Sequence, residues 1–125
     1  MSIPRDLAYT KEHEWIRVED GIATIGITDW AQGELGDIVF VEFPQVGDII
    51  EIGASFGTIE AVKAVSDMYA PVSGTITEIN SALEDDPMAI NSDPYGEGWI
   101  IKIKLSSPAE LDELLDASGY ENQIG

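Results

Sequence analysis

Lys63 is the residue of this sequence whose type and surroundings most readily support chemistry. It lies in the stretch GTIEAVKAVSD (57–67), with alanine and valine on both sides and no acidic residue within two positions. The chain has 24 acidic and only six basic residues, so a lysine in a short apolar run needs an explanation. The simplest one is a solvent-exposed lysine at the tip of a hairpin.

Three features favour a lysine that an enzyme acylates. Val62 and Val65 are β-branched, which indicates a turn between rigid strands, and the neighbouring alanines leave the ammonium group uncrowded. A second tight turn at 71–74 follows and fixes the returning strand. A catalytic amine would instead need a desolvated pocket or a cationic neighbour, and no basic residue is near Lys63 in the sequence. Acylation removes the charge and lets the side chain carry a long group.

Other reactive groups are scarce. One histidine and no cysteine exclude a zinc site of ordinary composition, a thiol nucleophile and a disulfide framework. The glycines at 96–99 follow a coil and read as turn glycines, not as a phosphate-binding loop. His13 could act as a general base, but a histidine between Glu12 and Glu14 with no nucleophile nearby is more often structural. We therefore expect no metal site and no independent enzymatic activity.

The composition indicates one folded domain, residues 1–125, with an acidic surface. Hydrophobic residues make up 44% of the chain, and the formal net charge is −18. This charge repels nucleic acid and anionic membranes and attracts partners with basic surfaces. No apolar run is long enough to cross a bilayer, and the start of the chain does not read as a targeting segment. We expect a cytoplasmic location, or the mitochondrial matrix only for a mature, processed chain.

The elements that position Lys63 are predicted to be mainly short strands, as in a sandwich or barrel. Thr28 is the expected N-cap of a short helix that ends at Gly36. Segment 80–98 reads as a long loop with short helical turns that start near Pro87 and Pro94. Alternating apolar residues bounded by turn residues predict strands at 14–19, 22–27, 37–43, 49–52, 55–60, 66–70, 75–79 and 99–105.

A capped helix is predicted near the carboxyl end of the chain. Segment 107–110, SPAE, has the pattern of a capping box with proline at the first helical position. Leu111, Leu114 and Leu115 follow at helical spacing, and Gly119 is expected to end the helix. We expect this helix to pack against the sheet through its leucines.

The segment GTIEAVKAVSDMYAPVSGTI resembles the lipoyl-attachment segment of the glycine cleavage system H-protein family. YTKEHEWIRVEDGIATIGITDWAQGELGDIVFVEFPQVGD is similar to the family's amino-terminal half, and NSDPYGEGWIIKIK to its late segment. The resemblance implies a mainly β, barrel-sandwich hybrid of the biotinyl/lipoyl type, with short peripheral helices and a C-terminal helix. It also implies that Lys63 carries lipoic acid by an amide bond. Biotin carriers typically present Met-Lys-Met, whereas Val62 and Ala64 flank this lysine, which favours lipoate.

In this family the lipoylated protein is a carrier and not an enzyme. The resemblance implies that an aminomethyl group travels on the arm from a pyridoxal-phosphate glycine decarboxylase to an aminomethyltransferase that uses tetrahydrofolate. An FAD-dependent dihydrolipoyl dehydrogenase reoxidises the arm, and a ligase or transferase attaches lipoate to Lys63. Glu14 and Asp67 match positions suited to holding the loaded arm in a cleft, since a carboxylate pairs with its ammonium group. The alternative for both residues is an ordinary surface acid.

Two other functions remain open from the sequence. Some chains of this family serve as lipoyl donors or relay proteins for other lipoyl-dependent enzymes. The second alternative is an unmodified acidic interaction module on the same scaffold. Replacing Lys63 with arginine separates a carrier from such a module, because only the carrier needs an acylated lysine.

Overall fold

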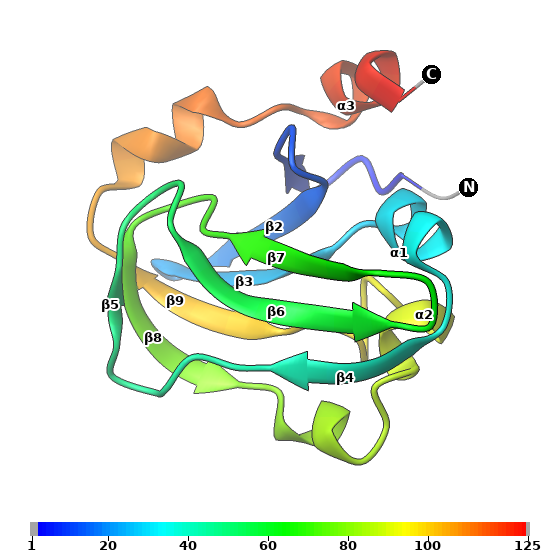
Figure 1. The fold of residues 1–125 in the computed structure, drawn as a ribbon. Helices are drawn as coiled ribbons and strands as arrows, with labels where there is room; N and C mark the ends of the chain where they lie inside the picture. The colour runs from blue at the N-terminus through cyan, green and yellow to red at the C-terminus, as the bar shows by residue number, and fades with distance from the viewer. Residues whose placement is uncertain (1–2, 125) are drawn as a thin grey trace.

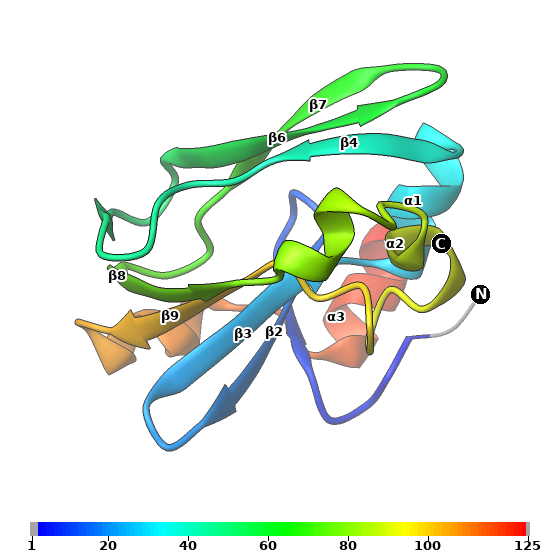
Figure 2. The same cartoon turned by 90° about the horizontal axis from the view of Figure 1, so that it is seen from below.

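The computed structural model describes residues 3–124, which form two antiparallel β-sheets packed face to face (Figures 1 and 2). One sheet has six strands in the order β1-β2-β3-β9-β8-β5, and the other has three in the order β4-β6-β7. The mainly β prediction is confirmed. The strands are β1 (Ala8–Tyr9), β2 (Glu14–Glu19), β3 (Ile22–Ile27), β4 (Ile38–Glu42), β5 (Ile49–Ile50), β6 (Ser55–Ala61), β7 (Val65–Tyr69), β8 (Gly74–Ile79) and β9 (Ile101–Leu105).

Short helices lie at the periphery of the two sheets (Figure 1). The loop predicted at 80–98 contains two of them. As expected for helix or turn starts, α2 begins shortly after Pro87 and a turn begins at Pro94. The helical elements are α1 (Asp29–Leu35), the 3₁₀-helix η1 (Ser81–Glu84), α2 (Ala89–Ser92), the 3₁₀-helix η2 (Pro108–Glu113) and α3 (Ala117–Ile124).

Local turn chemistry sets the β2–β3 hairpin and the helix that follows it. Asp20 and Gly21 have φ values of 52° and 78°, as a two-residue hairpin turn requires. The Thr28 side chain then caps α1 by accepting a hydrogen bond from the Ala31 backbone N–H at 3.2 Å. Gly36 ends α1 at φ 82°, and its N–H donates to the Gln32 carbonyl. The predicted helix is confirmed, and the hairpin joins the two strands that were predicted at 14–19 and 22–27.

The first half of strand β2 is buried on both of its faces and contributes to two apolar clusters. Ile16 faces the main core between the sheets, while Trp15 faces a second cluster with Tyr9, Ala117 and Tyr120 beneath α3. Glu14 therefore lies on the same face of β2 as Ile16 and points toward the space between the sheets. The main core includes Ile25, Ile27, Ile38, Val41, Phe56, Ile59, Met68, Ile76, Ile101 and Ile103.

The helix predicted from the capping box at 107–110 is wrong in its boundaries. The Glu110 carboxylate does not reach back to the turn start; it accepts hydrogen bonds from the Ser73 N–H at 2.7 Å and the Ser73 hydroxyl at 2.8 Å. The chain forms only η2 there, because Leu115 pairs in extended conformation with Tyr9 through two 2.8 Å backbone hydrogen bonds. The helix α3 begins after this bridge, and Gly119 lies inside it instead of ending it.

Candidate functional site

Lys63 lies at the tip of the hairpin that joins β6 to β7. The turn is closed by a 2.8 Å hydrogen bond from the Ala61 N–H to the Ala64 carbonyl. Lys63 is exposed, and the neighbouring side chains of Val62 and Val65 are 72% and 65% exposed. Within residues 3–124, no carboxylate forms an ion pair with the Lys63 ammonium group. The predicted turn is thus confirmed, and its lysine is accessible to a partner enzyme.

The tip of this hairpin rests on the junction between α1 and β4. The Val62 N–H donates to the Asp37 carbonyl at 3.0 Å, which ties the turn to the segment before β4. The methylene groups of Lys63 pass over Gly36, close enough that a Cβ on that glycine would lie 3.4 Å from Cδ and Cε. The lysine stem is therefore supported on one side by the end of α1, while the residue as a whole stays exposed.

The Asn91 side chain holds this junction in place from α2. Its amide donates to the Gly36 carbonyl and to the Gln32 side chain, both at 2.9 Å, and it accepts from the Ile38 N–H at 2.9 Å. One half-buried amide thus fixes the end of α1, the glycine under the lysine and the start of β4. Sequence reasoning did not single out Asn91, because asparagine is common in a loop rich in turn residues.

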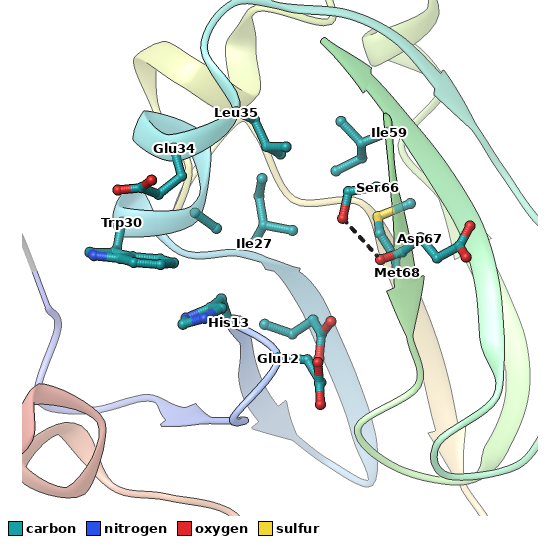
Figure 3. Close-up of a pocket in the computed structure, with 12 residues that line it drawn as sticks. Glu12, His13, Ile27, Trp30, Glu34, Leu35, Ile59, Ser66, Asp67 and Met68 are labelled. Atoms are coloured by element: carbon teal, nitrogen blue, oxygen red, sulfur yellow. Dashed lines mark hydrogen bonds between the residues drawn. The ribbon is translucent and has the colours of Figure 1, made fainter. Parts of the chain in front are cut away.

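A cavity of about 160 Å³ lies between α1 and β7 (Figure 3). Its apolar wall comes from both sheets and from one face of α1. Polar groups from the loop before β2 line its other side, and Glu34 projects from α1 (Figure 3). The lining residues are Glu12, His13, Glu14, Ile27, Trp30, Ala31, Glu34, Leu35, Ile59, Ser66, Asp67 and Met68. Such a cavity suits an apolar chain with a cationic end.

Glu14 is the buried carboxylate of this cavity, with only 2% of the residue exposed. The Thr10 hydroxyl donates to Oε1 at 2.7 Å, and the Tyr69 N–H donates to Oε2 at 3.4 Å. Burial raises the pKa of Glu14 from 4.5 to about 7, although both hydrogen bonds act in the opposite direction. A cation entering the cavity would compensate this desolvation, so the site is prepared for a positively charged group.

Thr10 sets the position of that carboxylate. Its hydroxyl oxygen accepts from the N–H groups of Glu12 at 3.2 Å and Glu14 at 3.1 Å, while the hydroxyl hydrogen goes to the Glu14 side chain. Hydrogen bonds within segment 10–14 therefore hold the Glu14 carboxylate in place without any ligand. Sequence reasoning did not single out Thr10, although a Thr-x-x-x-Glu pattern before a strand is compatible with a local turn.

Asp67 lines the cavity, but its carboxylate extends away from it in Figure 3. Side chains alternate along β7, and the buried Met68 faces inward. Ser66 therefore shares the inward face with Met68, and its side chain points into the cavity where Asp67 does not. The arm-holding role of Asp67 stays a prediction, and Ser66 is a lining residue that sequence reasoning missed.

His13 forms part of the cavity wall in an unusual backbone conformation, with φ 71°. Its ring stacks on Trp30 with 4.2 Å between the ring centroids, and its Nδ1 lies 2.9 Å from the Tyr120 hydroxyl. Burial lowers the pKa of His13, while Glu12 and Glu34 raise it less. These contacts agree with the structural role that was expected for this histidine.

Clusters of metal ligands and helices long and apolar enough to span a membrane are both absent from residues 3–124. Over that range, no three histidine or acidic side chains converge closely enough to hold a metal ion. None of the helices described there has the length and apolar character needed to cross a bilayer.

The family model, the relatives and the solved structure that resemble this chain are all described as glycine cleavage H proteins. The family model for the glycine cleavage H-protein matches residues 7–125. A glycine cleavage system H protein of Symbiobacterium thermophilum is 58% identical over 120 residues, which cover 96% of this chain and 94% of that protein. One from Staphylococcus carnosus is 54% identical over 125 residues, covering 100% and 99%. The crystal structure of a glycine cleavage system H protein from Mycobacterium marinum superposes with a TM-score of 0.92 at 45% identity, covering 98% of this chain and 99% of that one.

Proposed function

The chain belongs to the glycine cleavage H-protein family, and from this premise we propose that it is the lipoylated carrier of a glycine cleavage system. Residues 1–125 form one carrier domain, and lipoic acid is attached to Lys63. The protein is a substrate of the enzymes of that system and not an enzyme itself. The observation that carries the proposal is an exposed, unpaired lysine on a fixed turn beside a cavity with a buried carboxylate.

The geometry around Lys63 suits enzymatic attachment of a long acyl group. The tip is fixed by Val62 and Gly36, so an attaching ligase or transferase meets one defined backbone shape. The amine is free of ion pairs within the described residues, so no salt bridge must break before acylation. Acylation also removes a positive charge with which no acidic side chain of residues 3–124 forms an ion pair.

A lipoyl group attached at this position would supply a disulfide as the acceptor of the aminomethyl group. The protein residues provide the environment for the charged end of the arm. Ile27, Ile59 and Met68 give the cavity an apolar wall, and Ser66 offers a hydroxyl at its edge. Within this apolar wall, an ionised Glu14 attracts an ammonium group more strongly than it would in water.

Glu14 and Asp67 contribute differently to holding the arm in this proposal. Glu14 is buried and positioned by Thr10, so it pairs directly with the cation. The Asp67 carboxylate lies on the outer side of β7 and acts through its charge at the edge of the cavity. The contribution of Asp67 is consequently smaller, because solvent screens an exposed charge.

The proposed partners follow from the family. They are a glycine decarboxylase with pyridoxal phosphate, an aminomethyltransferase with tetrahydrofolate, a dihydrolipoyl dehydrogenase with FAD, and a lipoyl-attaching ligase or transferase. The net charge of −18 favours encounters with partners that have basic surfaces around their active sites. Encounters of this kind are fastest at low ionic strength. We propose a cytoplasmic location.

Replacing Lys63 with arginine tests the proposal. The arginine side chain keeps the positive charge and the aliphatic stem over Gly36 but cannot form the amide. We expect Lys63→Arg to abolish lipoylation and glycine cleavage in the reconstituted system. Lys11→Arg, on an exposed lysine of another loop, is the matched control and keeps both. Full glycine cleavage by the Lys63→Arg chain would refute the carrier function.

A further inference from the structure

Tyr120 connects the C-terminal helix to two walls of the cavity. It lies on α3, is fully buried, and stacks on Tyr9 with 4.8 Å between ring centroids. Its hydroxyl oxygen is 2.9 Å from His13 Nδ1 and 2.7 Å from Thr28 Oγ1. His13 lines the cavity directly, and Thr28 caps α1, which supplies another wall of the cavity through Trp30 and its neighbours. A single hydroxyl group therefore spans two elements that are distant in sequence.

The hydrogen-bonding needs of Thr28 indicate which atoms donate in the contacts between Thr28, Tyr120 and His13. Thr28 is fully buried, and its oxygen already accepts from the Ala31 N–H, so its hydroxyl hydrogen needs an acceptor. Among the described residues, the Tyr120 oxygen is the acceptor that lies within reach. With Thr28 as the donor to Tyr120, the Tyr120 hydrogen is available for His13 Nδ1, and the tautomer of the ring decides whether Nδ1 accepts it. Acceptance at Nδ1 requires a neutral His13 with its ring proton on Nε2.

The backbone conformation of His13 is an independent reason to expect that neighbouring side chains hold this residue in place. A non-glycine residue at φ 71° persists only where its surroundings hold it. The Tyr120 hydroxyl and the Trp30 ring are the side-chain contacts that hold this histidine. Because Glu14 follows His13 directly, a change in His13 is transmitted to the buried carboxylate.

We propose that Tyr120 is a positioning residue for the cavity between α1 and β7. Its hydroxyl group fixes His13 and the start of α1, and so allows Glu14 to hold the loaded arm. The inference rests on the proposed function and extends it to the C-terminal helix. Tyr120 does not line the cavity, so it acts through its two partners.

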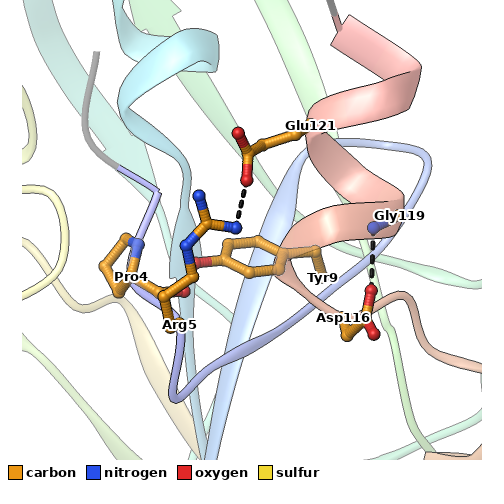
Figure 4. A network of polar contacts seen from close by, with 6 residues as sticks. All are labelled: Pro4, Arg5, Tyr9, Asp116, Gly119 and Glu121. Atoms are coloured by element: carbon orange, nitrogen blue, oxygen red, sulfur yellow. Dashed lines mark hydrogen bonds and ion pairs between the residues drawn. The ribbon is translucent and has the colours of Figure 1, made fainter.

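The helix that carries Tyr120 is itself fastened to the amino-terminal segment (Figure 4). Arg5 forms an ion pair with Glu121, and Asp116 starts the helix by accepting from the Gly119 N–H at 2.7 Å. Gln123 adds a hydrogen bond to the Lys11 carbonyl at 3.0 Å, within the loop that leads to His13. The helix is thus docked on both sides of Tyr120, which keeps the hydroxyl in place.

The test compares Tyr120→Phe with Tyr9→Phe. The first variant keeps the aromatic stack but loses both hydrogen bonds to the cavity walls. The second removes a hydroxyl from the same stack, where it donates to the Pro4 carbonyl at 2.5 Å (Figure 4), and leaves the cavity contacts intact. Both remove one buried tyrosine hydroxyl, so a general loss of packing or stability affects them alike.

The first readout uses the unmodified full-length chain, so it is independent of lipoylation. The ¹⁵N chemical shifts of the His13 ring should indicate the Nε2-protonated tautomer in the wild type and in Tyr9→Phe. In Tyr120→Phe they should move to a mixture of tautomers, because Nδ1 has lost its donor. Unchanged His13 shifts in Tyr120→Phe would overturn the inference and leave the proposed function untouched.

The second readout uses the lipoylated chain loaded with an aminomethyl group. Tyr120→Phe loses both hydrogen bonds, but they act on the arm only through His13 and Thr28, so we expect a net effect of about one hydrogen bond of ordinary strength: roughly three- to tenfold faster release of the group in buffer. We expect Tyr9→Phe to stay within about twofold of the wild type. Equal release rates for the two variants would overturn the inference even if the His13 shifts respond. A Lys63 that cannot be lipoylated would instead count against the proposed function.

Discussion

The buried carboxylate of Glu14 should make the stability of this protein depend on pH in a way that glutamine abolishes. Burial raises the pKa of Glu14 from 4.5 to about 7. Between these values the unfolded chain releases the proton while the folded chain keeps it. Stability is therefore lost as the pH rises from about 4.5 to about 7, and the loss is complete above the folded pKa. Glu14→Gln keeps the shape of the side chain but cannot ionise.

The expected size of the effect follows from the shift. One pKa unit corresponds to about 1.4 kcal/mol, and part of the loss is already present at pH 5. The free energy of unfolding of Glu14→Gln should therefore rise relative to the wild type by about 2–3 kcal/mol between pH 5 and pH 8.5. Any constant cost of the amide, such as a poorer contact with the Tyr69 N–H, cancels in this difference between two pH values.

Urea unfolding of both chains at pH 5 and pH 8.5 measures this quantity directly. Glu12→Gln is the matched control, because it removes the same formal charge from an exposed position of the same loop. A Glu14→Gln chain whose stability runs parallel to that of the wild type across this range would refute the reasoning. It would mean that the carboxylate is hydrated in the folded protein.

Two further predictions concern the loaded arm and the glycine beneath the lysine. Because Glu14 ionises as the pH rises through about 7, the wild-type chain should retain an aminomethyl group better at pH 8 than at pH 6, by up to about tenfold relative to Glu14→Gln. Equal ratios of release rates at the two pH values would contradict this. Gly36 has φ 82° and ψ −160°, a region open essentially to glycine alone, so Gly36→Ala should destabilise the fold by about 1–3 kcal/mol. Lipoylation of Lys63 should persist, since the added methyl group would only contact the lysine stem; thermal unfolding and intact mass test the two parts.

The sequence predicted the strands and the Lys63 turn well because their signals are local. Asp20 and Gly21 require a particular turn, and Thr28 and Gly36 bound α1 within one short segment. The outward direction of the Asp67 side chain could also have been predicted. Side chains alternate along a strand, so an apolar Met68 that faces the core places Asp67 on the opposite face. The family resemblance singled out Asp67 as a residue that holds the arm. The alternation of side chains along β7 places Ser66, which was missed, on the cavity side.

The features that escaped prediction depend on contacts between distant parts of the chain. The capping-box pattern at 107–110 was overruled by the contact of Glu110 with Ser73, and Leu115 was drawn into a bridge with Tyr9. Local propensity cannot anticipate such competition. Likewise, the burial of Glu14 and the position of Tyr120 arise only when β2, β7, α1 and α3 come together.

Intact-mass measurement of the protein from its native source, with peptide mapping of segment 61–69, tests the central claim most directly. The carrier function predicts a lipoyl increment located on Lys63. A biotin increment would move the protein to carboxylation chemistry. An unmodified Lys63 in cells that lipoylate their other carriers would contradict the account and favour an acidic interaction module.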